Sequence, residues 1–314
     1  MRVIRHRIPN TEVLYSTLQT ARPGPTVVIT ANIHGDECTG LGVVYRLMES
    51  LPKRLRCGMV HLYPSLNPKG LQQYSRTFPD NASDLNRLFP GRARGSAAER
   101  WVHLLWTNIA AKKPDLVLDL HTDSQLSIPY VLIDRVIKSK GSSSLSERCA
   151  RIAQATGLIP VWEYPTRRYR QYGLEKTLSG CVMNTLGTAS LTLEVGPRRT
   201  LEPKAVAIAQ QAVENVLSHL GLLDTPLPET NAGVKWQRGH GPTISKAGVF
   251  VPTQAPGAII AAGSELGRVY DIYGSLLETL VCSEEALVLS YPDKAYVKRS
   301  QGCATLAVKA DPSA

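Results

Sequence analysis

The stretch Pro25-Thr-Val-Val-Ile-Thr-Ala-Asn-Ile33 leads directly into His34-Gly35-Asp36-Glu37. Its first part is apolar and rich in β-branched residues, which predicts a strand that is covered on both faces. Residues 38–50 then follow a helical pattern. A buried strand that passes through a polar turn into a helix is the basic unit of an α/β fold. In such folds ligands bind at the carboxyl ends of the strands, where these polar residues are expected.

The same alternation continues along the chain. Further strands are predicted at 57–63, 115–120 and 189–195, and helices at 96–111, 144–157 and 201–220. Two of these helices begin with a capping-box spacing, Ser96 with Glu99 and Ser144 with Glu147. We therefore predict an α/β fold with a mostly parallel mixed sheet flanked by helices.

The character of the sequence changes near residue 222. Residues 225–234 are rich in proline and in turn-forming residues, which is typical of a linker. After them, short apolar runs are separated by glycines and long helical patterns disappear. We predict a catalytic domain over residues 1–224 and a small C-terminal β domain over residues 235–314.

Composition limits the classes of partner. The 314 residues include 36 Lys and Arg against 26 Asp and Glu, a net charge of +10, which suits an anionic substrate. Aromatic residues make up 6% and no nucleic-acid motif is present, so nucleic-acid binding is not expected. No apolar run is long enough to span a membrane, and no apolar stretch follows the basic N-terminus. Six scattered cysteines without a CxxC pair are typical of a reduced cytoplasmic protein, and a homo-oligomer is compatible with the sequence.

Two histidines and a glutamate form a candidate metal site. His34 and Glu37 are three residues apart at a strand-to-helix turn, and His121 follows the predicted strand 115–120. Two histidines and one carboxylate are the ligands of a catalytic zinc site with an open fourth position. We expect one Zn²⁺ per chain at this place.

Two acidic residues are placed to assist such an ion. Asp119 shares a strand face with His121, so its carboxylate can orient the imidazole from behind. Glu194 ends the strand 189–195, where it can act as the general base and acid toward water and a leaving amine.

Residues between the two histidines suit an anionic substrate. Arg87 offers a planar fork for a carboxylate, and Asn86 can add a neutral hydrogen bond. Arg76 can polarise a scissile carbonyl and stabilise its oxyanion, although a structural pairing with Asp80 or Asp84 is the alternative.

In order along the chain, the motifs are HxxE, NPxG, Arg76, DLNR, DLH and EVG. As a set they resemble the succinylglutamate desuccinylase and aspartoacylase family over residues 26–200. The resemblance implies a zinc carboxypeptidase-like fold. The resemblance implies His34, Glu37 and His121 as zinc ligands and Glu194 as general base and acid. It also implies Asn86 and Arg87 as the carboxylate clamp. Arg76 then polarises the carbonyl and Asp119 lies behind a ligand, as the family pattern has them.

The implied reaction is hydrolysis of the amide of a small, anionic N-acyl amino acid or related amine. One alternative is a metallocarboxypeptidase acting on a peptide, although the β domain would narrow the cleft against such a substrate. A basic binding module for RNA is a further alternative, supported by the net charge alone. Candidates for additional substrate contacts are the basic segment Arg167–Arg170 and Tyr270 or Tyr273.

Overall fold

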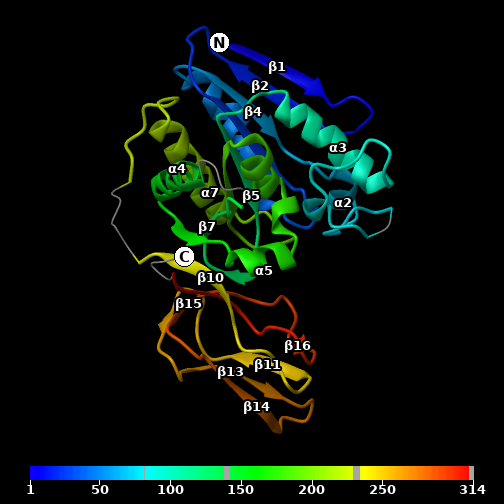
Figure 1. The fold of residues 1–314 in the computed structure, drawn as a ribbon, viewed down its shortest axis with the longest axis vertical. Coiled ribbons are helices and arrows are strands. Elements are labelled where there is room, and N and C mark those ends of the chain that lie inside the picture. The colour runs from blue at the N-terminus through cyan, green and yellow to red at the C-terminus, as the bar shows by residue number, and fades with distance from the viewer. Residues whose placement is uncertain (81, 138–141, 229–233, 311–314) are drawn as a thin grey trace.

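The computed structural model of the chain describes residues 1–80, 82–137, 142–228 and 234–310. It has an α/β part that contains the N-terminus and a β part built from the later residues (Figure 1). The predicted fold class is confirmed: a large mixed sheet is flanked by helices, and a smaller antiparallel sheet follows.

Four buried parallel strands form the centre of the large sheet. Their spatial order is β4 (Met59–Tyr63), β3 (Thr26–Ala31), β5 (Leu116–His121) and β9 (Ala189–Glu194). Each lies within a stretch predicted as a strand, apart from His121, which extends β5 by one residue. The parallel arrangement brings the carboxyl ends of β3, β5 and β9 to one edge, where the predicted site residues follow.

Several strands were not predicted from the sequence. They are β1 (Arg2–Arg7), β2 (Leu14–Gln19), β6 (Leu126–Ser127), β7 (Tyr130–Ile133) and β8 (Ile159–Trp162). β1 is mostly exposed and rich in arginine, and β6, β7 and β8 span only two to four residues, which is too short for a clear period in the sequence. β7 and β8 are parallel to each other, whereas β7 is antiparallel to β9, so the sheet changes direction beside Glu194.

Helices cover both faces of the sheet. α1 (Thr39–Ser50), α4 (Ser142–Ala155) and α7 (Pro203–His219) pack together through one apolar cluster. Residues of α3 (Ala97–Ala110) and α6 (Leu178–Cys181) contribute to a second cluster. The shorter helical segments are α2 (Pro68–Gln72), α5 (Thr166–Gln171), and the single turns Leu51–Lys53, Leu85–Arg87, Leu174–Lys176 and Val182–Leu186.

The two predicted capping boxes had different outcomes. The first is confirmed, because the Ser96 side chain accepts from Glu99 N while Glu99 accepts from Ser96 N. The second is wrong: α4 begins at Ser142, so Ser144 lies inside the helix rather than at its cap.

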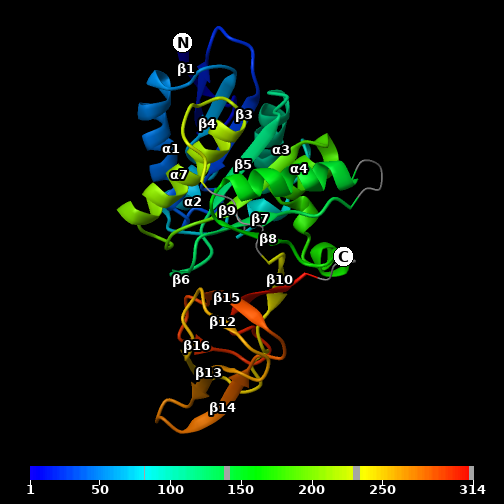
Figure 2. The ribbon, with the colours of Figure 1, turned by 90° about the vertical axis from the view of Figure 1, so that its left-hand side faces the viewer.

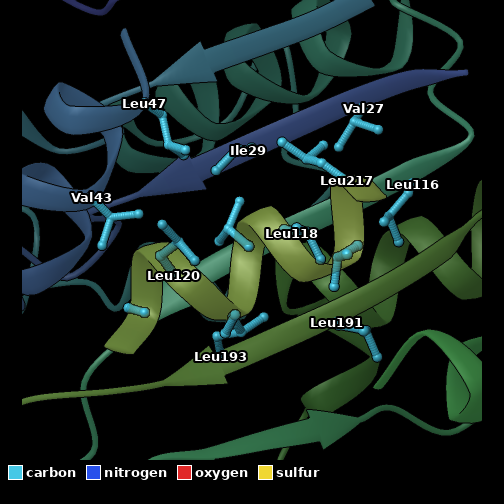
Figure 3. Packing of buried hydrophobic residues seen from close by; sticks show 14 of the residues in the cluster. Val27, Ile29, Val43, Leu47, Leu116, Leu118, Leu120, Leu191, Leu193 and Leu217 are labelled. Atoms are coloured by element: carbon cyan, nitrogen blue, oxygen red, sulfur yellow. The ribbon is translucent and has the colours of Figure 1, made fainter. Parts of the chain in front are cut away.

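The main core lies between the central strands and helices α1 and α7 (Figure 3). Ile29 of β3 and Leu118 of β5 are fully buried there, as are Leu47 of α1 and Leu217 of α7. Burying each such side chain contributes about 1.5–3 kcal/mol. This packing holds rigid the strand ends that carry the candidate site.

Some strands of the C-terminal part extend the large sheet, and the others form a second, separate sheet. Strand β10 (Trp236–His240) pairs in parallel with β8, and β17 (Thr305–Lys309), β15 (Ala286–Tyr291) and β12 (Ile259–Ile260) continue outward (Figure 2). A separate four-stranded sheet consists of β14 (Leu276–Val281), β13 (Glu265–Tyr270), β11 (Gly248–Pro252) and β16 (Tyr296–Val297).

The division into domains 1–224 and 235–314 stays a prediction. Residues 229–233 of the predicted linker lie outside the described residues. Within the described ranges, no helix is both long enough and apolar enough to cross a membrane.

Candidate active site

The turn after β3 is built to present His34 and Glu37. Asn32 adopts a positive φ of 56°, a conformation that asparagine tolerates better than most residues. Its side-chain amide donates to the carbonyl oxygens of His34, Gly35 and Glu37 at 2.9, 3.1 and 3.0 Å. A Cβ at Gly35 would lie 2.0 Å from a backbone carbon of Gly70, so only glycine fits this close approach. The His-Gly-Asp-Glu sequence therefore sets the shape of the turn as well as its chemistry.

His34, Glu37 and His121 come together as predicted. One potential ligand atom from each lies within 4.8 Å of the others, and all three side chains are buried. Glu37 lies between the two imidazoles, with Oε1 2.9 Å from His34 Nδ1 and Oε2 2.8 Å from His121 Nδ1. Burial opposes ionisation of Glu37, but the two facing imidazoles hold its pKa well below the usual range. The arrangement is compatible with a shared divalent cation.

A second carboxylate lies behind each imidazole. His121 Nε2 is 2.9 Å from Asp119 Oδ2, and His34 Nε2 is 3.1 Å from Asp84 Oδ1. The sequence analysis proposed Asp119 for this position but gave Asp84 no such role. Asp119 is itself held by the Thr30 hydroxyl, which donates to Oδ1 at 2.7 Å. Such carboxylates fix the ring orientation and leave the opposite nitrogen toward the ligand centre.

Glu194 lies beside this group. It is the register partner of His121 on the neighbouring parallel strand. Its Oε2 atom is buried and has no hydrogen-bond partner among the described residues. Burial, together with the charges of Glu37 and Asp123, raises the pKa of Glu194 to about 8, although His121 opposes this. A buried carboxylate with a free oxygen next to a metal-compatible group is suited to proton transfer.

Arg76 and Asn86 contact the metal-compatible group directly. Arg76 donates to Glu37 Oε1 at 2.9 Å and to Asp84 Oδ2 at 3.3 Å, so the structural pairing with Asp84 is present. Asn86 Oδ1 accepts from Leu178 N at 2.7 Å, and its Nδ2 is 3.4 Å from His121 Nε2. These bonds fix the Asn86 amide.

The Arg87 guanidinium donates to the carbonyl oxygen of Asn86 at 2.8 Å. No carboxylate lies within ion-pair distance of it among the described residues. A half-buried guanidinium that faces a cavity without a carboxylate partner is free to bind one from a ligand.

One cavity of about 110 Å³ connects these residues. Its lining includes each predicted metal ligand, Arg76, Asn86, Arg87 and Glu194. It also includes residues that the sequence analysis did not assign: Thr122, Asp123, Leu132, Asp134, Glu163, Leu174, Thr177, Thr192, Arg198 and Arg238. Arg238 comes from β10, and the other charged residues among them follow the ends of β5, β7, β8 and β9.

The candidates for additional substrate contacts, Arg167–Arg170, Tyr270 and Tyr273, do not line this cavity. Arg167, Arg168 and Arg170 are exposed on α5, and their neighbour Tyr169 is buried with its hydroxyl on Asp134. Tyr270 lies in β13 of the separate sheet, and Tyr273 is 87% exposed. None of these residues is part of the cavity lining. Arg198 and Arg238 line it instead, from the segment after Glu194 and from β10.

The fold and the grouped His, Glu and His side chains define a hydrolase-like α/β protein with a candidate metal centre. Residues 23–220 match the succinylglutamate desuccinylase/aspartoacylase catalytic domain. Because the match covers more than half of the chain, the protein belongs to this family.

Relatives of this chain extend the comparison. It is 26% identical over 260 residues to the N-alpha-acetyl-L-2,4-diaminobutyric acid deacetylase of Halomonas elongata, covering 79% of this chain and 71% of the relative. A succinylglutamate desuccinylase/aspartoacylase from Rhodobacter sphaeroides superimposes with a TM-score of 0.81 at 24% identity, over 96% and 90% of the two chains. The product-bound ectoine utilization protein EutE from Ruegeria pomeroyi has a TM-score of 0.80 at 21% identity, over 94% and 89%. These structures share the fold over nearly the whole chain.

Proposed function

We propose that this chain is a zinc-dependent deacylase that hydrolyses the amide of a small N-acylated amino acid. The observation that carries the proposal is the group His34–Glu37–His121 with Glu194 beside it, in one cavity with Arg87. Family membership and the deacetylase activity named for the Halomonas relative support it.

The donor set fits one zinc ion per chain. Two imidazole nitrogens and a carboxylate are ligands that zinc takes in catalytic sites, and Asp84 and Asp119 hold the imidazoles from behind. When bound in such a site, zinc lowers the pKa of a water ligand and polarises a carbonyl. The unpartnered Oε2 of Glu194 further supports a ligand between this residue and the histidines.

The chain's own residues would carry the remaining chemistry. Glu194 would take the proton from the attacking water and then deliver it to the leaving amine. Its pKa of about 8 without a cation would fall beside one, because the positive charge favours the carboxylate. Arg76 would stabilise the negative charge that develops on the carbonyl oxygen. Arg87, with Asn86 fixed next to it, would bind the substrate carboxylate.

The size of the cavity favours a small substrate over a peptide. Arg238 from the C-terminal part and Glu163 form a 2.8 Å ion pair in its lining. The small cavity, with this ion pair in its lining, supports a deacylase rather than the metallocarboxypeptidase alternative. No contact in the described ranges supports the RNA-binding alternative.

The proposal is tested by metal analysis and substrate screening on one purified sample. N-acetyl and N-succinyl amino acids would be offered, and the freed amine detected with ninhydrin. We expect about one zinc per chain and amine release from at least one substrate. Metal-free protein that takes up no zinc, or zinc-loaded protein that cleaves C-terminal peptide bonds but no N-acyl amino acid, would overturn it.

A further inference from the structure

Two large apolar side chains are exposed at the end of a β-hairpin in the C-terminal part. Residues 271–275 join β13 to β14, and within them Ile272 is 72% exposed and Tyr273 is 87% exposed. We call residues 271–275 the tip. Neither side chain lines the cavity of the candidate active site. Tyrosine is over-represented among the residues that carry the binding energy of protein interfaces, so the tip is a candidate contact surface.

Hydrogen bonds within the tip hold it in one conformation. Asp271 Oδ1 accepts from Tyr273 N and from Ser275 N, both at 2.8 Å. Asp271 N in turn donates to the carbonyl oxygen of Ser275 at 2.9 Å, and Gly274 has a positive φ of 90°. These bonds fix the backbone that carries Ile272 and Tyr273. Little conformational entropy would therefore be lost when the tip binds a partner.

A groove with an apolar floor lies between the first two strands and helix α1. Its volume is about 500 Å³, and the floor includes Leu14 of β2 with Tyr45 and Met48 of α1. Leu14 is 52% exposed and Tyr45 is 50% exposed. Arg5 and Arg7 of β1 also line the groove, which we call the N-terminal groove. Its lining suits a partner with exposed apolar side chains beside a negative charge.

The hairpins that carry the two surfaces have opposite charge. Residues 265–281, which form β13, the tip and β14, contain three acidic residues and one arginine, a net charge of −2. Residues 2–19, which form β1 and β2, contain three arginines and one glutamate, a net charge of +2. The negative hairpin belongs to a chain whose overall net charge is +10. Complementary charge of this kind favours association of the two surfaces.

The tip and the N-terminal groove lie at opposite ends of the molecule, so they cannot meet within one chain. β1 lies at one end of the longest axis and β14 at the other (Figure 1), and the view from the side agrees (Figure 2). Two copies that lie side by side in antiparallel orientation would place each tip at the groove of the other copy. A twofold axis then makes the two contacts equivalent and closes the assembly at two chains.

We propose that two copies of this chain form a closed dimer in which the tip of each copy docks into the N-terminal groove of the other. The apolar side chains of the tip are then buried against the apolar floor of the groove. Asp271 lies near Arg5 and Arg7 in this dimer, and none of the three forms an ion pair among the described residues of one chain. The proposal is independent of the deacylase activity, because neither surface lines the candidate active site.

A dimer formed through β1 is the alternative, and charge disfavours it. β1 is the last strand on one side of the large sheet, so its outer edge is unpaired among the described strands. It carries Arg2, Arg5 and Arg7, and pairing with a second copy would bring three arginines from each chain together. Like charges on neighbouring strands are destabilising. The two arrangements therefore predict opposite effects of reversing the charge of these arginines.

The first test measures the mass of the full chain by analytical ultracentrifugation over a series of concentrations. We expect a reversible change from 34.3 kDa to twice that mass, with a dimer that salt weakens. The double variant Arg5→Glu, Arg7→Glu should dimerise less tightly. A monomer at every concentration, a series of larger polymers, or a tighter dimer in the double variant would overturn the proposal.

The second test changes one tyrosine on each surface. Tyr273→Ser on the tip and Tyr45→Ser in the groove should each raise the Kd of the dimer by about 30-fold, as for a buried aromatic anchor. Tyr296→Ser is the matched control, because Tyr296 is 53% exposed in β16, at the opposite edge of the small sheet from β14. Its Kd should not change, and circular dichroism would confirm that each variant is folded. An unchanged Kd in the first two variants, or an equal rise in the control, would contradict the proposed contact.

Mixing the two variants tests whether the tip contacts the groove. In a mixed dimer, the Tyr45→Ser chain supplies an intact tip and the Tyr273→Ser chain supplies an intact groove, so one of the two contacts is restored. Because residues in contact do not contribute additively, the mixed dimer should be tighter than either variant dimer by more than statistics allow. Fluorescence energy transfer between labelled chains measures it. A mixed dimer that is no tighter would show that the two surfaces do not meet, and the proposal would fail.

Discussion

His121 of β5 and Glu194 of β9 are register partners on adjacent parallel strands. Both side chains line the same cavity, so the third candidate ligand and the candidate base lie next to each other. Hydrogen bonds between the two strands fix this relationship, which gives the site a rigid base. The predicted consequences for the two residues differ, because one would hold the metal and the other would move protons.

Replacing the candidate base should separate metal binding from turnover. Glu194→Gln keeps the shape of the side chain but removes its basicity, so kcat should fall by about 10²–10⁴-fold. Zinc content should not change, because Glu194 is not part of the His34–Glu37–His121 group. Kinetics and elemental analysis would be run together, with the exposed Glu202→Gln as a control. A normal kcat in Glu194→Gln would remove it from the mechanism.

Loss of a candidate ligand should remove the metal as well as the activity. His121→Ala should lose both zinc and activity, because two ligands remain where a catalytic site uses three. His219→Ala, which changes an exposed histidine at the end of α7, should retain both. Equilibrium dialysis against zinc measures the effect. A full zinc complement in His121→Ala would contradict its assignment.

The two carboxylates behind the imidazoles should contribute about equally to zinc affinity. Asp84→Asn and Asp119→Asn should each weaken zinc binding by about 10–100-fold, because each releases one imidazole from its orientation. Competition with a chelator of known affinity measures the change. Weakened binding in Asp119→Asn alone would show that the contact between His34 and Asp84 does not orient a ligand.

Removing the candidate carboxylate clamp should mainly raise KM. Arg87→Ala removes a guanidinium that faces the cavity, and we expect KM to rise by about tenfold or more with a smaller change in kcat, as for uniform binding. Arg167→Ala, on the exposed side of α5, is the matched control and should leave KM unchanged. If KM rises in the control and not in Arg87→Ala, the clamp lies in the basic segment 167–170.

Asp134 should make stability depend on pH. Its pKa is raised from 3.8 to about 7, so the folded state keeps a proton that the unfolded chain releases above pH 3.8. The stability due to this proton is complete below pH 3.8 and is lost as the pH rises toward 7. Asp134→Asn does not titrate, and it should therefore be more stable than the unmodified protein at pH 8, with a difference that shrinks toward pH 4. Urea midpoints of metal-free protein across this range measure it, and a difference that is constant with pH would contradict the shift.

The local sequence was sufficient to predict the central strands and the first candidate residues. The apolar run before His34 predicts β3, and the run before His121 predicts β5, because a strand covered on both faces needs apolar residues at nearly every position. His34 and Glu37 are neighbours in one turn, so their spacing alone indicates a shared ligand. The pairing of Asp119 with His121 follows from the two-residue period of a strand.

Other parts of the site depend on contacts between residues far apart in the chain. Asp84 reaches His34 across 50 positions. Asp134, Glu163 and Arg238 line one cavity, although the first two follow the short strands β7 and β8 and the third lies in β10. Periodicity carries no information about which strands become neighbours, so no local signal connects these residues. The sequence therefore indicates the chemistry of the reacting centre, whose residues lie at the ends of strongly apolar strands. The cavity that would select the substrate arises from strand pairing and the position of β10, which only the packed chain establishes.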